Sequence, residues 1–372
     1  MTGLDFTGLT TCPAQVWGGV RLVPLVREEP LPGLRLHREV YDRFGEVLVS
    51  PGISYVSYIP HGLVADWSGE QSASYGTQLD TARPTGMAVG RHHRMVKRRP
   101  SGKKERAGGA VTRCRFLPLH LAMEGYLALH FGGPAIAWNE WSMEALRQGL
   151  SPRAEAAYLG HDVPGLADAL RVFEIHPGQC GVLVYVADAL AAAFVVPHPD
   201  DYRALHPTLL QDMYGELIHQ YGHFGGPVPD FEARLGDGGH IGTLGDLRAA
   251  ARAQERAWRA SHDTVMAREL LGTSYAFQRV YRMASFDMYR FLPPFRPGSE
   301  GQHIGELITD HKGRTAYLKT FRLAPAQVRR GHLLNSLADN DWHLRRTADR
   351  LGTTPEEIVR RIRAAGFGTL LK

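Results

Sequence analysis

The chain of 372 residues has few cysteines and no long hydrophobic segment. Its three cysteines, Cys12, Cys114 and Cys180, are far apart and form no CxxC pair, which argues against a disulfide framework and a cysteine zinc site. The longest nearly apolar run, residues 182–196, is interrupted by Asp188 and is too short to span a bilayer. The opening MTGLDFTGLT lacks the features of a secretory signal. We therefore expect a cytoplasmic protein with no membrane partner.

The chain also lacks a recognisable catalytic or cofactor motif. The Gly-rich segment GDGGHIGTLGD follows no predicted strand, so it fails the context test for a dinucleotide-binding loop. Cys180 leads directly into an apolar segment, which favours an inert core thiol. One predicted helix carries a polar line at Asp212, Glu216, His219 and His223. Since no second helix offers matching ligands, a solvated face is the simpler interpretation. We predict no metal and no cofactor, and leave open whether the protein is an enzyme.

Positive charge is concentrated in one stretch. RHHRMVKRRPSGKKER, residues 91–106, contains eight Lys or Arg and one Glu, a net charge of +7 in a chain whose formal net charge is +5. Flanking glycines are typical of a mobile loop. Cations at this density favour a polyphosphate through counterion release, and a solubilising loop is the alternative. The predicted phosphate contacts are Arg94, Lys97, Arg98, Arg99, Lys103 and Lys104.

Hydrophobic periodicity predicts an α+β protein. Residues 16–26 and 53–59 have the β-branched and aromatic composition of strands. Residues 181–196 favour a buried hairpin that leads to a helix after Pro207. We expect an N-terminal domain with a mixed sheet and packed helices over residues 1–225.

A second region, residues 226–325, is predicted to contain a linker, a helix and a hairpin. Residues 246–271 favour one long helix rich in Ala and Arg, and residues 306–321 favour a hairpin that turns at Lys312 and Gly313. Aromatic residues interleave with arginines between Tyr275 and Phe295. They favour a core position over a nucleic-acid surface. A small trihelical unit is expected over residues 326–372.

The C-terminal segment carries clear helix boundary signals. Gly352 stands where the turn between two helices requires a positive φ. Thr354 and Glu357 match a capping box, in which the threonine hydroxyl bonds the Glu357 amide and the glutamate carboxylate reaches back. Ile358 and Ile362 lie four residues apart, so they are expected to be buried on one face.

This segment resembles the small helix-turn-helix of the Fis type. The matching residues are Trp342, Ala348, Leu351, Gly352, Ile358 and Ile362. The resemblance implies that the second helix enters the major groove of DNA. Its implied contacts are Thr353, Glu356, Arg360 and Arg361. The acidic residues at the start of that helix depart from the family pattern, because negative charge there would repel the DNA phosphates. The alternative is a helical hairpin that docks on protein, with the Arg360 face buried rather than exposed.

Three further stretches carry a second resemblance. They are WGGVRLVPLV, EGYLALHFGGPAIAWNEWS and GQCGVLVYVADALAAAFVVPHPDDYRALHPTLLQDMYGELI. They resemble the bacterial domain family associated with ADP-ribosylglycohydrolases and rhodanese/phosphatase-superfamily proteins. The resemblance implies an α+β domain and a link to NAD or ADP-ribose metabolism, and it supplies no catalytic residue.

Taken together, these features predict a regulatory or binding protein. It would couple a phosphorylated or nucleotide-derived ligand to DNA or a partner through the C-terminal helices. An enzyme or accessory factor in NAD- or ADP-ribose-linked metabolism is one alternative. A self-assembling scaffold is another, and a homo-oligomer is compatible with each.

Overall fold

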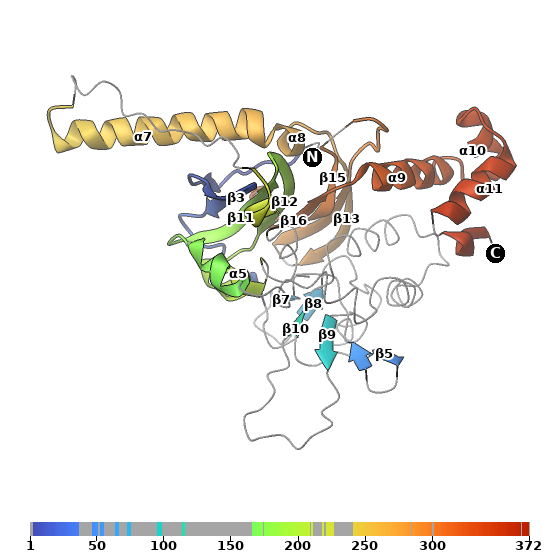
Figure 1. The fold of residues 1–372 in the computed structure, drawn as a ribbon, viewed down its shortest axis with the longest axis horizontal. Helices are drawn as coiled ribbons and strands as arrows, with labels where there is room; N and C mark the ends of the chain where they lie inside the picture. The colour runs from blue at the N-terminus through green and yellow to red at the C-terminus, as the bar shows by residue number, and fades with distance from the viewer. Residues whose placement is uncertain are drawn as a thin grey trace, which may run out of the picture.

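The computed structural model describes residues 3–36, 166–173, 175–208, 221–226, 241–283, 285–299, 301–365 and 367–371, together with Leu210, Ile218 and short strands between residues 47 and 115. A nine-stranded sheet lies at the centre of the described part of the chain (Figure 1). The strands are β1 (Thr10–Thr11), β2 (Gln15–Trp17), β3 (Val20–Val26), β11 (Gln179–Val186), β12 (Ala189–Val195), β13 (Ala276–Met283), β14 (Phe286–Leu292), β15 (His303–Asp310) and β16 (Thr315–Arg322).

The order of the strands is β1-β3-β11-β12-β16-β15-β14-β13, with β2 paired to β3 outside this path. Every described strand pair in it is antiparallel, which corrects the predicted mixed sheet. Short connections reverse the chain in the hairpins β2–β3, β11–β12, β13–β14 and β15–β16. Side-chain alternation alone does not report strand direction.

Two hairpins supply the centre of the sheet. β11 and β12 are joined by Ala187 and Asp188, whose φ angles are 46° and 64°. β15 and β16 turn at Gly313, with a φ of 80°, so both predicted hairpins are confirmed. Residues 182–185 and 192–195 are at most 1% exposed, which means that both faces of the sheet are covered here.

The two predicted regions share this sheet. β12 pairs with β16, with Ala192 opposite Phe321 and Val195 opposite Leu318. The boundary predicted at residue 225 therefore does not separate two sheets. Tyr275, Phe286 and Phe291 of the predicted aromatic segment are at most 6% exposed, which confirms their core position.

Two small sheets complete the described strands. One has the order β10-β9-β6-β5 and the other β4-β7-β8. Their strands are β4 (Arg35–Leu36), β5 (Val47–Ser50), β6 (Ile53–Tyr55), β7 (Val64–Asp66), β8 (Ala73–Tyr75), β9 (Met95–Arg98) and β10 (Cys114–Arg115). β9 lies inside the basic stretch that was predicted to be a loop, so the prediction is wrong for these four residues. They pair with β6 and β10.

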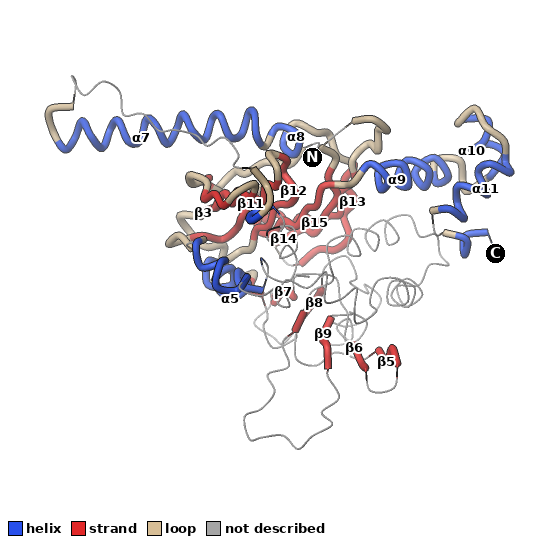
Figure 2. The backbone as a smooth tube through the Cα atoms, viewed as in Figure 1, coloured by secondary structure: helices blue, strands red, loops and turns tan. Residues whose placement is uncertain are grey.

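The helices lie at the sides of the large sheet (Figure 2). They are α4 (Leu166–Ala169), the 3-10 helix η5 (Leu170–Val172), α5 (Pro199–Thr208), α7 (Leu244–Ser261), the π-helix η7 (His262–Met266), α8 (Arg268–Leu271), α9 (Pro325–Ala338), α10 (Leu344–Arg350), α11 (Pro355–Ala364) and the 3-10 helix η8 (Gly368–Leu371). Helix α7 projects on one side of the sheet, and α9 to α11 extend on the other. None of the helices in the described part of the chain is long and apolar enough to cross a membrane.

Two helical regions differ from the prediction or are described only in part. Helix α5 precedes the helix expected after Pro207 and was not predicted; proline and the acidic residues Asp200 and Asp201 suit its first turn. Most of the helix expected after Pro207 falls outside the described residues, of which Ile218 and residues 221–223 are helical. The single helix expected over residues 246–271 is divided into α7, the π-helix η7 and α8. Apolar periodicity does not indicate where one extra residue enters a helical turn.

Candidate functional site

A cavity of about 1150 Å³ lies between the α7–α8 segment and the ends of strands β3, β12 and β16. Its walls contain four arginines, Arg21, Arg268, Arg296 and Arg322. They also contain two carboxylates, Asp188 and Glu269, and the hydroxyl groups of Thr273 and Ser299. The lining side chains therefore have more positive than negative charge, which suits an anionic ligand.

Arg21 belongs to the inner wall of this cavity. It stands on β3, and its side chain is only 7% exposed. Its Nη1 donates to the Met266 sulfur at 3.7 Å, and its Nη2 lies 3.8 Å from the Asp188 carboxylate. A charge this buried is costly unless it is compensated. The Asp188 carboxylate supplies part of that compensation.

The π-helix η7 builds the adjoining wall around His262. This residue is 1% exposed, and its Nε2 lies 2.8 Å from the Tyr185 hydroxyl. Its Nδ1 lies 2.9 Å from the Asp263 carboxylate. A carboxylate only accepts, so Nδ1–H donates to it, and in the neutral imidazole Nε2 then accepts from the tyrosine. Burial raises the pKa of Tyr185, which keeps this hydroxyl protonated as a donor.

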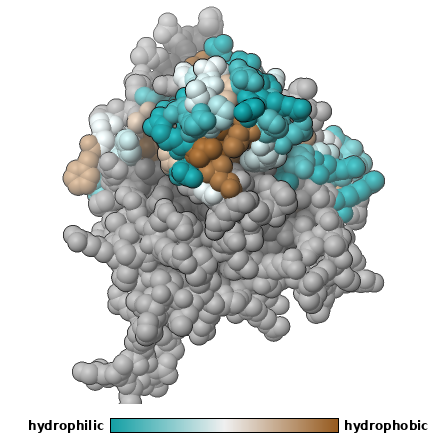
Figure 3. Space-filling view, turned by 90° about the vertical axis from the view of Figure 1, so that its right-hand side faces the viewer, coloured by the Kyte–Doolittle hydropathy of each residue, from teal (hydrophilic) through white to brown (hydrophobic). Residues whose placement is uncertain are grey.

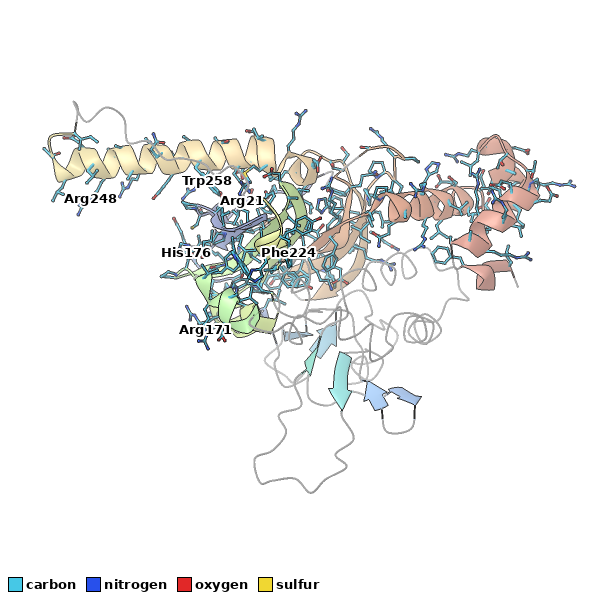
Figure 4. All side chains as sticks on the ribbon, viewed as in Figure 1. Arg21, Arg171, His176, Phe224, Arg248 and Trp258 are labelled. Atoms are coloured by element: carbon cyan, nitrogen blue, oxygen red, sulfur yellow. The ribbon has the colours of Figure 1, made fainter. Side chains whose placement is uncertain are left out.

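Trp258 connects this hydrogen-bond chain to the cavity. Its ring stacks on His262, with ring centroids 5.1 Å apart and an interplanar angle of 16°. Both Trp258 and Met266 line the cavity (Figure 4 labels Trp258 and Arg21). Single π turns are frequent at functional sites. Here the π turn places His262 and Asp263 so that they hold Trp258 and the cavity wall in position.

The opposite wall comes from the segment around β15 and β16. Gly301 has a φ of 68°, and a side chain there would collide with the Glu269 carboxylate. His303 pairs with Arg322 across β15 and β16. Burial, with a smaller contribution from Arg322, lowers the pKa of His303 to about 3. His303 is therefore neutral near pH 7, and Arg322, which lines the cavity, is the charged member of this pair.

A second charged cluster lies within the sheet. Arg290 of β14, Glu306 of β15 and Lys319 of β16 are neighbours across the strands. The Lys319 Nζ lies 2.9 Å from the Glu306 carboxylate, and the two side chains are 0% and 1% exposed. Burial lowers the pKa of Lys319, and Glu306 opposes that shift. Because side chains alternate along a strand, this cluster and His303 lie on opposite faces of the sheet.

The C-terminal candidates lie on α11 and the turn before it. Thr354 accepts from the Glu357 amide at 3.2 Å, as predicted. The Glu357 carboxylate does not reach back to the cap. It accepts from Arg360 at 2.6 and 2.8 Å and from Arg361 at 2.8 Å. These bonds lower the pKa of Glu357 to about 2. The capping box is therefore only half formed, because two arginines one turn away compete for the carboxylate.

The predicted DNA contacts are on the surface. Arg360 is 76% exposed and Arg361 is 47% exposed, and Glu356 is exposed beside them while Thr353 is half-buried. Ile358 and Ile362 are at most 1% exposed, as predicted. The surface at this end of the molecule is mostly hydrophilic around a small apolar patch (Figure 3).

Of the predicted phosphate contacts, Lys97 and Arg98 lie on β9, opposite Tyr55 and Ser54. The other four, Arg94, Arg99, Lys103 and Lys104, fall outside the described residues.

Two other sequence candidates lie wholly or partly among the described residues. His223 is exposed, and its ring packs on Trp17 with centroids 4.9 Å apart. The remaining members of its polar line lie outside the described residues, and no group of potential metal ligands occurs in the described part of the chain. Cys180 is 0% exposed, and burial raises the pKa of its thiol. The predicted core position of this cysteine is confirmed.

The cavity residues themselves were not predicted. They come from segments that are far apart in the sequence, so no local pattern groups them. Only the four-residue spacing of Trp258 and His262 could have been noticed in the sequence, because it allows two rings to touch on one face of a helix.

A family model described as ARPP-2 matches residues 4–284. The chain belongs to the ARPP-2 family. The match includes the three stretches on which the family resemblance was based. Comparisons with curated proteins and with solved structures found no match. The matched region contains Arg21, Trp258 and Arg268 of the ARPP-2 domain but ends before Arg296, Arg322 and the C-terminal helices.

Proposed function

We propose that this ARPP-2 protein binds a small phosphate-bearing molecule in the arginine-lined cavity. The observation that carries the proposal is the presence of four arginines and two carboxylates around a volume of about 1150 Å³. Drug-sized ligands occupy cavities of roughly 300–1,000 Å³, so a nucleotide-sized molecule fits. Guanidinium groups bind phosphate oxygens in pairs, and hydroxyls such as those of Thr273 and Ser299 add donors.

Arg268 and Arg296 are the groups most available for such a ligand. Both are exposed at the cavity, and neither guanidinium has an ion-pair partner within the described part of the chain. Arg21 differs, since Asp188 and Met266 hold it in position. The expected arrangement is a fixed inner arginine and two outer arginines that close on the phosphates.

Calorimetric titration of the full chain tests this proposal. The probes are pyrophosphate, ATP and ADP-ribose, the last because the family resemblance implies a link to ADP-ribose metabolism. We expect Arg268→Ala combined with Arg296→Ala to weaken binding about tenfold or more per arginine, the range for charge-assisted hydrogen bonds. Arg345→Ala combined with Arg363→Ala removes two exposed arginines from α10 and α11 and should change nothing. Absence of binding to every probe would overturn the proposal.

The same titration addresses the enzyme alternative. Hydrolysis of ADP-ribose or ATP during incubation, lost in the cavity double variant, would indicate that the arginines hold a substrate. Stable binding without turnover would indicate a sensor.

We further propose that α11 contacts duplex DNA. The supporting observation is that Arg360 and Arg361 are exposed and that Glu357 orients both. A docked hairpin would bury this face. Arg360→Ala and Arg361→Ala should each cost about 1–3 kcal/mol of binding if they contact a base, and should alter sequence preference at one position. Fluorescence polarisation with random and genomic duplexes measures this, and equal binding by both variants and the wild type would exclude α11. Together, the two proposals describe a regulatory protein that responds to a phosphorylated ligand.

A further inference from the structure

Helix α7 has an unusual relation to the rest of the protein. It extends well beyond the edge of the sheet (Figure 1). All six residues from 244 to 249 are exposed, and Trp258 near the other end is the one buried residue of the helix. A helix normally gains its stability by burying an apolar face. The stability of the outer half of α7 must therefore have another source.

Local interactions are enough to start this helix. The Thr243 hydroxyl accepts from the Asp246 amide at 3.1 Å, and the Asp246 carboxylate accepts from the Thr243 amide at 2.8 Å. This complete capping box fixes the first turn. Alanine at 249, 250, 251 and 253 favours the helical state that follows. Helix α7 can therefore project without support from neighbouring elements.

Three arginines follow one another along the outer part of α7. Arg248, Arg252 and Arg256 are spaced by four residues, so they share one face, and all three are exposed. Within the described residues, none of the three guanidinium groups has an ion-pair or hydrogen-bond partner. Figure 4 shows Arg248 on the projecting part. Like charges four residues apart destabilise a helix, and a bound polyanion would remove that repulsion.

The spacing and composition favour nucleic acid among polyanions. Four residues advance a helix by about 6 Å, so the three guanidinium groups extend over about 12 Å along its axis. Arginine binds phosphate oxygens in pairs. A helix that lies in a membrane surface needs a broad face of large apolar residues. Here only Leu244 and Leu247, at 73% and 40% exposure, are large apolar residues on the projecting part.

We infer that α7 lies in the major groove of duplex DNA, with Arg248, Arg252 and Arg256 on the phosphates. A helix is about 10–12 Å wide and the groove is about 12 Å wide, so only a helix that is free on most sides can enter. In the described structure residues 244–249 of α7 are all exposed, which suits this condition, and the buried Trp258 anchors the inner end of the helix. This inference uses neither the cavity nor α11.

Fluorescence anisotropy with the full chain and a labelled duplex of random sequence tests the inference. Replacing Arg248, Arg252 and Arg256 by Ala removes three phosphate contacts. The slope of log affinity against log salt should then decrease by about 2.7, since each contact contributes about 0.9. Raising the salt from about 50 to about 200 mM should therefore weaken duplex binding about 40-fold more in the wild type than in the variant.

The matched control replaces Arg171, Arg203 and Arg279 by Ala. It removes the same charge from arginines that already form surface ion pairs, so the slope should stay at the wild-type value. A variant with Lys at the three α7 positions should keep the slope and bind less tightly. Circular dichroism checks that each protein is folded.

The inference would be overturned by an unchanged slope in the α7 variant or by an equal decrease of the slope in the control. Arginine-dependent binding to anionic vesicles of phosphatidylserine without duplex binding would also overturn it. Loss of duplex binding that requires only Arg360 and Arg361 would assign DNA to α11 and likewise overturn the role of α7.

Discussion

Lowering the pH should destabilise the protein through His303. The side chain is 0% exposed, and among the described residues neither ring nitrogen has a hydrogen-bond partner. Burial lowers its pKa from the ordinary value of 6.5 to about 3. Between these values the unfolded chain binds a proton at this position and the folded protein does not. The free energy of unfolding therefore decreases as the pH decreases from 6.5 towards 3.

The size of the effect follows from the pKa difference. Each pH unit in this window is worth about 1.4 kcal/mol for one titrating group. At about pH 4.5, which is about two units below the pKa in the unfolded chain, His303 should lower the free energy of unfolding by about 2.7 kcal/mol. Domains have a total stability of about 5–15 kcal/mol, so this loss is large enough to measure.

Urea unfolding of the wild type and of His303→Met, at about pH 7 and about pH 4.5, isolates this contribution. Methionine has no titrating group, so the variant should lose about 2.7 kcal/mol less than the wild type over this interval. His206, whose pKa burial lowers to about 4, is present in both proteins and cancels in the comparison. His311→Gln, at an exposed turn position, should behave as the wild type. Equal losses in wild type and His303→Met would refute the assignment.

Two further predictions concern packing. Glu306→Gln should lower the free energy of unfolding by about 3–5 kcal/mol, because it leaves Arg290 and Lys319 without the carboxylate between them. Lys319→Met should lower it less. Equal losses in urea unfolding would contradict this order. Thr354→Ala should cost about 1 kcal/mol of local stability. Ile362→Ala should lower the local stability by about 2–4 kcal/mol, because the side chain is buried. Hydrogen exchange measures both losses in α10 and α11. Slower exchange in Ile362→Ala than in Thr354→Ala would contradict the burial of Ile362.

The sequence by itself determined the features that depend on near neighbours. The turn at Gly313, the positive φ of Gly352 and the cap at Thr354 follow from steric and hydrogen-bonding preferences of a few adjacent residues. The alternating and continuous apolar patterns identified both central hairpins. The buried pair Ile358 and Ile362 followed from helical spacing.

Only the tertiary structure decided the contacts between distant segments. The pairing of β12 with β16 depends on which apolar edges meet, and no local pattern encodes that choice. The Glu357 carboxylate had two sets of donors within reach, and the arginines outcompeted the cap amide because a charged donor bonds more strongly. The cavity joins Arg21 to Arg322 across most of the chain. The cavity is positively charged because folding brings together arginines that form no motif in the sequence. The site therefore depends on packing between distant segments.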